Sequence, residues 1–213
     1  MPAQRAQKRF AGWLLLVLLC LAVSVYALAY LVLGEAMYPP NLAASFLQHQ
    51  GQLKLHVAGG SLALALGPFL IAGPRARRAR HRALGKLYVG AVLLGGIGGL
   101  SLAPFSFGGW ATHLGFAALG VAWIGVTCAA WVRIRKGDVA GHRAWMTRSF
   151  LLTLAAVTLR IELPLAGLLG LPFETSYPVI SWMCWVPNLL VAEVLVRSTG
   201  WSRSPSLGTA STA

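Results

Sequence analysis

The sequence predicts an all-α, polytopic membrane protein with six transmembrane helices and a four-helix core made by helices two to five. Of its 213 residues, 57% are hydrophobic and only 11% are charged, whereas roughly a quarter of a soluble domain is charged. A helix needs roughly 20 mostly apolar residues to cross the hydrocarbon core of a bilayer. Six stretches meet this requirement, at residues 10–33, 55–71, 84–102, 110–132, 145–163 and 177–196.

The strong positive charge orients the chain in the membrane. The formal net charge is +13, which by itself would be compatible with a nucleic-acid partner. If both termini are cytoplasmic, however, all lysines and arginines except Lys54 and Arg160 lie on the cytoplasmic side, as the positive-inside rule requires. We therefore expect a multi-pass protein of the cytoplasmic membrane, in contact with the lipid bilayer and without a nucleic-acid partner.

The chain divides into two short ends and one membrane domain. Residues 1–9 are the expected cytoplasmic N-terminus, and residues 10–197 form the six-helix domain with its core at 53–163. Residues 198–213 are rich in Ser, Thr, Gly and Pro, so we expect a disordered cytoplasmic tail. The external loop 34–52 contains Pro39-Pro40, which blocks a continuous helix, and a short interfacial helix is expected at 41–49.

Four histidines stand at the beginning of the four core spans. His56 and His113 open the second and fourth helices, and His81 and His142 open the third and fifth. Because successive membrane helices run in opposite directions, the first two share one membrane face and the other two share the opposite face. His49 lies in the external loop and is assigned no role.

The core also looks internally duplicated. His56 and His113 are each followed by an apolar span, a basic run and a second histidine, which stands in the sequences His81-Arg82-Ala83-Leu84 and His142-Arg143-Ala144-Trp145. Two such hairpins in the same orientation would be related by a pseudo-two-fold axis along the membrane normal. That axis would set equivalent histidines opposite each other.

Two imidazoles near each face are the pattern of a protein that holds two b-type haems. Neutral imidazole is a haem ligand, and two axial histidines leave the iron suited to passing electrons. The hypothesis assigns His56 and His113 to an outer haem and His81 and His142 to an inner one. Arg160 outside, and Arg82 and Arg143 inside, could bind the haem propionates because guanidinium binds carboxylates bidentately. The electron donor would be a quinol or a redox partner protein, and the chain a subunit of a membrane oxidoreductase.

Other interpretations stay open. The histidines and arginines could be polar anchors at the membrane interface, or serve a non-haem metal or a proton relay. The chain would then be a small transporter or a structural or sensory subunit. Two further features concern packing. Arg148 and Glu193 lie at similar depth, which predicts a salt bridge, and Gly95-x-x-x-Gly99 has the spacing with which membrane helices approach closely.

The motifs resemble a family of bacterial predicted membrane proteins catalogued as domain of unknown function 2306. The resemblance covers about residues 55–196 and supports the fold, while the family carries no settled activity. The matching residues are His56, Gly60, Gly67-Pro68, His81-Arg82-x-Leu84-Gly85-x-x-Tyr88, His142-Arg143-x-Trp145-Met146-x-Arg148-Ser149, Leu159-Arg160, Trp185, Asn188 and Glu193.

The histidine pattern alone is similar to that of the transmembrane ascorbate-reducible b-type cytochromes. Those proteins have six helices and hold two haems, pairing helix two with four and helix three with five. Here the histidines lie closer to the ends of the helices than in those cytochromes, and no further motif is shared. This resemblance implies two haem b groups and reductase activity only as expectations.

Overall fold

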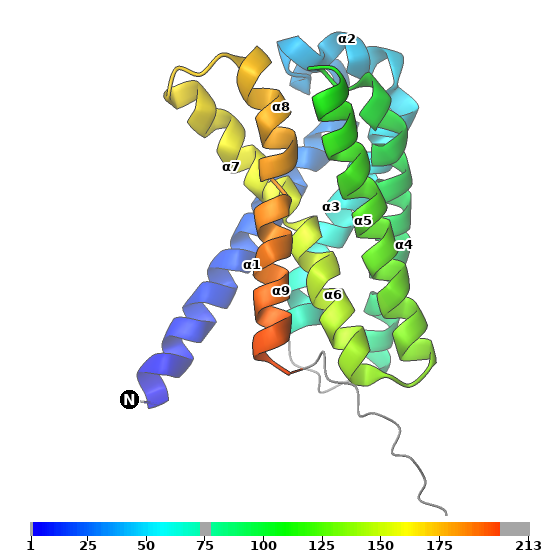
Figure 1. Ribbon diagram of the computed structural model, residues 1–213, viewed down its shortest axis with the longest axis vertical. Coiled ribbons are helices and arrows are strands. Elements are labelled where there is room, and N and C mark those ends of the chain that lie inside the picture. Colours follow the sequence, from blue (N-terminus) through cyan, green and yellow to red (C-terminus); the bar gives the residue numbers. More distant parts are fainter. Residues whose placement is uncertain (1, 73–77, 201–213) are drawn as a thin grey trace, which may run out of the picture.

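The computed structural model describes residues 2–72 and 78–200, which form helices joined by short turns. Their order is α1 (Pro2–Val32), η1 (Gly34–Met37), α2 (Pro40–Gln48), α3 (Gln50–Ala72), α4 (Arg78–Leu102), η2 (Ala103–Phe105), α5 (Trp110–Arg135), α6 (Val139–Thr153), α7 (Ala155–Leu168), α8 (Phe173–Met183) and α9 (Val186–Ser198). Helices α3, α4, α5, α6, α8 and α9 run roughly along the long axis of the molecule, while α1 and α7 are inclined to it (Figure 1). The chain is an integral, multi-pass membrane protein, as its six long apolar spans and the absence of strands in the described residues indicate.

The fifth and sixth spans are longer than predicted, because each consists of two helices. The fifth covers Val139–Leu168 and the sixth Phe173–Ser198. The fifth breaks at Leu154, one residue after Thr153, whose side chain donates to the Ser149 carbonyl at 2.9 Å. Such back-bonding within a helix often bends it. The sixth breaks just before Pro187, which cannot donate a backbone hydrogen bond.

Helices α3, α4, α5 and α6 form a ring in which each contacts the next and α6 contacts α3. Helix α1 packs outside the ring on α3, and α9 packs outside it on α6. The predicted four-helix core is therefore present, but only over half of its length. Beyond Leu154, α7 leans away from α5 (Figure 1), and α8 packs against α5 instead. The prediction of a core along the whole span is therefore corrected, because the fifth span is broken at Leu154.

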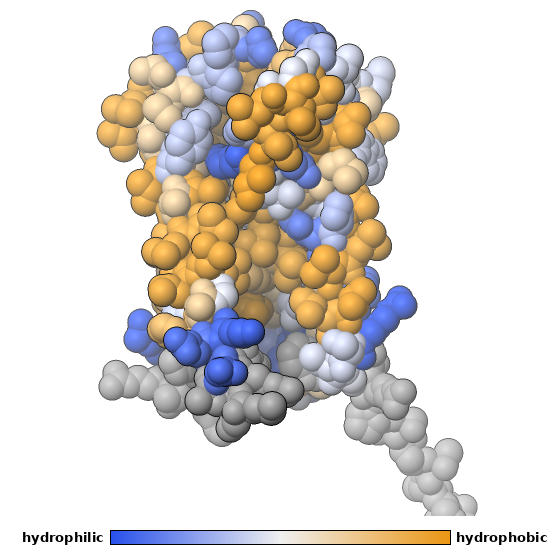
Figure 2. Space-filling view, turned by 90° about the vertical axis from the view of Figure 1, so that its left-hand side faces the viewer, coloured by the Kyte–Doolittle hydropathy of each residue, from blue (hydrophilic) through white to orange (hydrophobic). Residues whose placement is uncertain are grey.

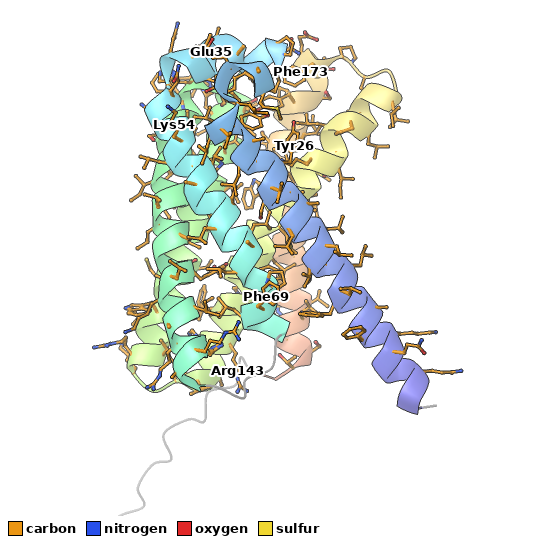
Figure 3. The ribbon with its side chains drawn as sticks, turned by 180° about the vertical axis from the view of Figure 1, so that it is seen from behind. Tyr26, Glu35, Lys54, Phe69, Arg143 and Phe173 are labelled. Carbon is orange, nitrogen blue, oxygen red and sulfur yellow. The ribbon has the colours of Figure 1, made fainter. Side chains whose placement is uncertain are left out.

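The two ends of the bundle differ in charge. Helix α1 begins and α9 ends at the same end (Figure 1), and this end also carries Arg143 (Figure 3). We call it the basic end. Glu35, Lys54 and Phe173 lie at the other end, here called the α2 end (Figure 3). Between them the surface is mostly apolar (Figure 2), as a lipid-facing belt must be. Which side of the membrane the basic end faces stays a prediction.

Two smaller predictions concern the segments outside the spans. The expected interfacial helix is present as α2, with Pro39 at its N-cap and Pro40 at its first position, so the two prolines do separate it from the preceding chain. The predicted disordered tail lies, from residue 201 on, outside the described residues. The predicted N-terminal segment belongs to α1, which begins at Pro2.

Helices α3 and α4 pack backbone against backbone through glycines. A Cβ atom added at Gly95 would lie 2.7 Å from the Gly60 nitrogen, and one at Gly98 would lie 2.5 Å from the His56 nitrogen. A Cβ at Gly59 would overlap the backbone of Gly95. This confirms the close approach predicted from the Gly95–Gly99 spacing, and it explains the glycine content of this hairpin.

We expect Gly95→Leu to separate α3 from α4, because the new side chain would meet backbone atoms that cannot move aside. Overpacking of this kind costs about 1–3 kcal/mol or more. Thermal unfolding of the detergent-solubilised protein measures the loss. Gly90→Leu is the matched control on the same helix, since a Cβ there meets nothing within 4 Å. Equal melting temperatures for the two variants would contradict this packing.

Candidate functional site at the two ends of the bundle

His81 and His142 lie on the inward faces of two helices that stand diagonally across the ring. Tyr88 is seven residues after His81 on α4, and Ser149 is seven residues after His142 on α6. Residues seven apart share a helix face. The Tyr88 hydroxyl lies 3.0 Å from Ser149 Oγ, and both residues are buried. The two histidines therefore begin the same inward seam, about 10 Å nearer the basic end.

Helix α5 and the turn between α5 and α6 together hold His142 in place. Its Nδ1 lies 2.9 Å from the Ala130 carbonyl oxygen and must donate to it. Asp138 caps α6 by accepting from the Gly141 N–H at 2.8 Å, and it also pairs with Arg133 at 3.0 Å. These two contacts, the backbone bond above all, lower the pKa of Asp138. The carboxylate thus stays ionised and fixes the start of the helix.

The α2 end does not repeat this arrangement. His56 Nδ1 donates to the Gly95 carbonyl at 2.8 Å, and the ring lies against Gly99. His113 instead donates Nε2 to the Ser106 carbonyl at 2.8 Å and packs edge-on against Trp110. The two residues are equivalent in the predicted duplication, yet their contacts differ. His56 is also six residues inside α3, which begins at Gln50, so it does not stand at the helix start as predicted.

A buried polar network that the sequence analysis did not identify joins α4, α5 and α6. The Thr127 and Ser149 hydroxyls are 2.7 Å apart, Ser149 is 3.0 Å from the Tyr88 hydroxyl, and Tyr88 is 2.9 Å from the Thr153 hydroxyl. Trp123 Nε1 also donates to Thr153 at 2.9 Å. The hydroxyls can be oriented head to tail, so each buried group has a partner. The network fills the interior of the ring about two helical turns farther from the basic end than His81 and His142.

The predicted salt bridge between α6 and α9 is confirmed. Arg148 binds Glu193 through two hydrogen bonds, at 2.6 and 3.0 Å. The guanidinium also lies over the Trp145 ring, 4.7 Å from its centroid. A bidentate pair of this kind fixes direction as well as distance. It attaches the sixth span to the ring.

The three arginines proposed as propionate partners occupy different surroundings. Arg82 and Arg143 are exposed near the histidines of the basic end. Arg160 is partly buried on α7, where its Nη1 donates to the Ala156 carbonyl at 3.0 Å and its Nε has no partner in the described residues. His56 and Arg160 line one cavity between α1, α3 and α7. The structure thus brings Arg160 near His56, whereas His113, in the first turn of α5, is bonded to the loop that precedes this helix.

The part of the chain that the structure describes contains no cluster of metal ligands, and this includes the surroundings of the four core histidines. No group of three or more His, Cys, Asp and Glu side chains is placed to hold an ion there. A larger hollow of about 530 Å³ lies on the outer side of the α5–α6 turn. Its lining contains none of the four core histidines. An axial haem pair uses only two histidines, so the haem hypothesis stays a prediction.

Removing the acidic partner of Arg148 should destabilise the protein. Glu193→Gln leaves a largely buried guanidinium, 14% exposed, without its counter-ion. Breaking a fully buried pair costs about 3–5 kcal/mol, and we expect about 2 kcal/mol here because the Glu193 side chain is 33% exposed. Denaturant unfolding in detergent measures the loss, with Glu174→Gln, an exposed carboxylate at the α2 end, as the control. An equal effect of both substitutions would show that the pair contributes nothing.

Comparison with known proteins gives one match. The model of a family described as a predicted membrane protein (DUF2306) matches residues 53–196. The match covers more than half of the chain and contains the four core histidines, the polar network, the Arg148–Glu193 pair and Arg160. It agrees with the resemblance seen in the sequence motifs. No curated protein and no solved structure matches the chain.

Proposed function

We propose that this chain, which belongs to the DUF2306 family of predicted membrane proteins, carries electrons in the membrane by means of b-type haem. The proposal places one haem between His81 and His142 at the basic end and a second between His56 and His113 at the α2 end. It makes the protein a subunit of a membrane oxidoreductase, with a quinol or a redox protein as electron donor.

The observation that supports the proposal most directly is the register of α4 and α6. Both helices start at the basic end, and the Tyr88–Ser149 contact fixes which of their faces turn inward. His81 and His142 precede that contact by the same number of residues, so they stand at one level on the diagonal of the ring. Axial ligation of a macrocycle requires two such side chains from opposite walls.

The donor chemistry at the basic end fits a haem. Because Nδ1 of His142 donates to a backbone carbonyl, the ring is held in the tautomer whose Nε2 can coordinate a metal. The exposed guanidinium groups of Arg82 and Arg143 suit the two propionates. A bound haem would supply one-electron redox chemistry. The chain's own residues hold the imidazoles, and the buried Tyr88 network closes the site toward the membrane interior.

The second haem has less support from the geometry. His56 resembles His142, since its Nδ1 also donates to a backbone carbonyl. His113 would have to release the Ser106 carbonyl before its Nε2 could coordinate iron. In addition, α7 leans away from the ring at this level. The helices that would surround the second haem are therefore not the same four that surround His81 and His142. A protein with a single haem would place it between His81 and His142.

The competing candidate is a non-redox membrane protein in which the histidines join helices or relay protons. It is favoured by the bonds that His56 and His142 make to carbonyls of neighbouring helices. Such bonds stabilise a bundle without any cofactor. The hydroxyl network through Tyr88 could also pass protons over a short distance. The two candidates differ in one property that is easily measured, the presence of haem.

We expect protein purified from haem-replete cells to show the reduced absorption bands of b-type haem after addition of dithionite. His81→Ala should remove about half of the haem if two groups are bound, because each bis-histidine site loses its iron with either ligand. The pyridine haemochrome assay measures the ratio of haem to protein. His49→Ala is the control, since His49 is stacked on Phe105 at the α2 end.

Two results would refute the electron-carrier proposal. One is a haem-free protein that is folded and monodisperse when purified from such cells. The other is a haem content that falls as much in the His49 variant as in the His81 variant. Loss of all haem from His81→Ala would instead assign a single haem to the basic end.

A further inference from the structure

Arg160 is a cation within a membrane span that lacks an acidic partner in the described residues. The ion pairs found there involve Arg133 with Asp138 and Arg148 with Glu193. The Arg160 Nε is buried without a hydrogen-bond acceptor, and within the described residues the guanidinium bonds, through Nη1, to the carbonyl of Ala156 on its own helix. Charged groups at this depth are costly and are usually paired. The guanidinium therefore lacks the anion with which a cation inside a membrane span is usually paired.

The cavity beside Arg160 offers room for that anion. It has a volume of about 50 Å³ and lies where α1, α3 and α7 meet. By this measure one water needs about 10–15 Å³, so the space suits a group of a few heavy atoms. Ser61 lines the same cavity, and its hydroxyl is also buried without a partner. His56 adds a third polar group to the lining.

The remaining walls suit an apolar chain that continues from such a group. They comprise Val23 and Ala27 on α1 and Val57 and Leu64 on α3. On the lipid side, the Tyr26 ring lies 5.6 Å from the Arg160 guanidinium carbon and is 48% exposed. Tyr26 stands on α1 beside α7 (Figure 3). On this side of the molecule, hydrophilic residues are visible among the apolar residues of the surface (Figure 2).

We propose that the cavity between α1, α3 and α7 binds the carboxylate of an acidic, single-chain amphiphile, with Arg160 as the charged contact and Ser61 as a hydrogen-bond donor. The guanidinium offers Nε and its remaining Nη in the fork geometry that suits a carboxylate. The small volume favours a carboxylate over a phospholipid phosphate with its glycerol. The hydrocarbon chain would leave between α1 and α7 toward the bilayer. This proposal does not depend on the haem between His81 and His142.

The test is binding of radiolabelled oleate to the full chain in phosphatidylcholine nanodiscs. We expect one saturable site per chain that is weakened about tenfold or more in Arg160→Gln, because hydrogen bonds to a charged group are among the strongest that proteins make. Arg160→Lys should bind several-fold more weakly than the native chain, since it keeps the charge but loses the fork. Arg135→Gln removes an equal charge from an exposed position at the end of α5 and should bind normally.

A second variant tests the cavity without touching the charge. A Cβ at Gly60 meets nothing within 4 Å, and Gly60 lines the cavity. Gly60→Val should therefore occupy the space and abolish oleate binding in a protein that still folds. Binding that is unchanged in both Arg160→Gln and Gly60→Val would overturn the proposal. Displacement of oleate by methyl oleate or by inorganic phosphate at similar concentration would also overturn it, the first because no charge is read and the second because a free anion suffices.

Discussion

The membrane interior has no water with which to satisfy polar groups, and the arrangement of this bundle depends on how it meets that constraint. Tyr88, Ser149 and Thr153 pair with one another, and Thr127 and Trp123 complete the set from α5. An unpaired hydroxyl in this position would cost more than the bond itself contributes. The network therefore fixes the rotation of α4, α5 and α6 about their axes. The inward positions of His81 and His142 follow from that rotation.

Much of the fold could be predicted because the bilayer makes strong demands on sequence. The lengths of the apolar stretches predicted the six spans, and Pro39-Pro40 predicted the separation of α2 from the preceding chain. The similar depth of Arg148 and Glu193 predicted their salt bridge. The break at Leu154 was missed because neither proline nor glycine marks the position. We attribute it to the hydrogen bond from the Thr153 side chain to the Ser149 carbonyl. The hydropathy of a sequence does not predict a hydrogen bond of this kind.

The positions of the candidate residues could be predicted only in part. Alternation of helix direction placed His81 with His142, and helix periodicity from Tyr88 and Ser149 would have indicated their common seam. Nothing in the sequence distinguished His56 from His113, whose different partners depend on the loop before α5 and on the departure of α7 from the ring. Arg160 was expected to meet an anion. Its unsatisfied Nε and the adjacent cavity became visible only in three dimensions.

The measurement that tests the central claim most directly is low-temperature electron paramagnetic resonance of the oxidised protein. If His81 and His142 face each other across the ring, the ferric iron between them has two axial imidazoles and gives a low-spin signal. Replacing His142 with Ala should remove that signal or convert it to a high-spin one. A haem signal that is unaffected by replacing either histidine would contradict the account, as would the absence of any ferric haem signal from the native protein.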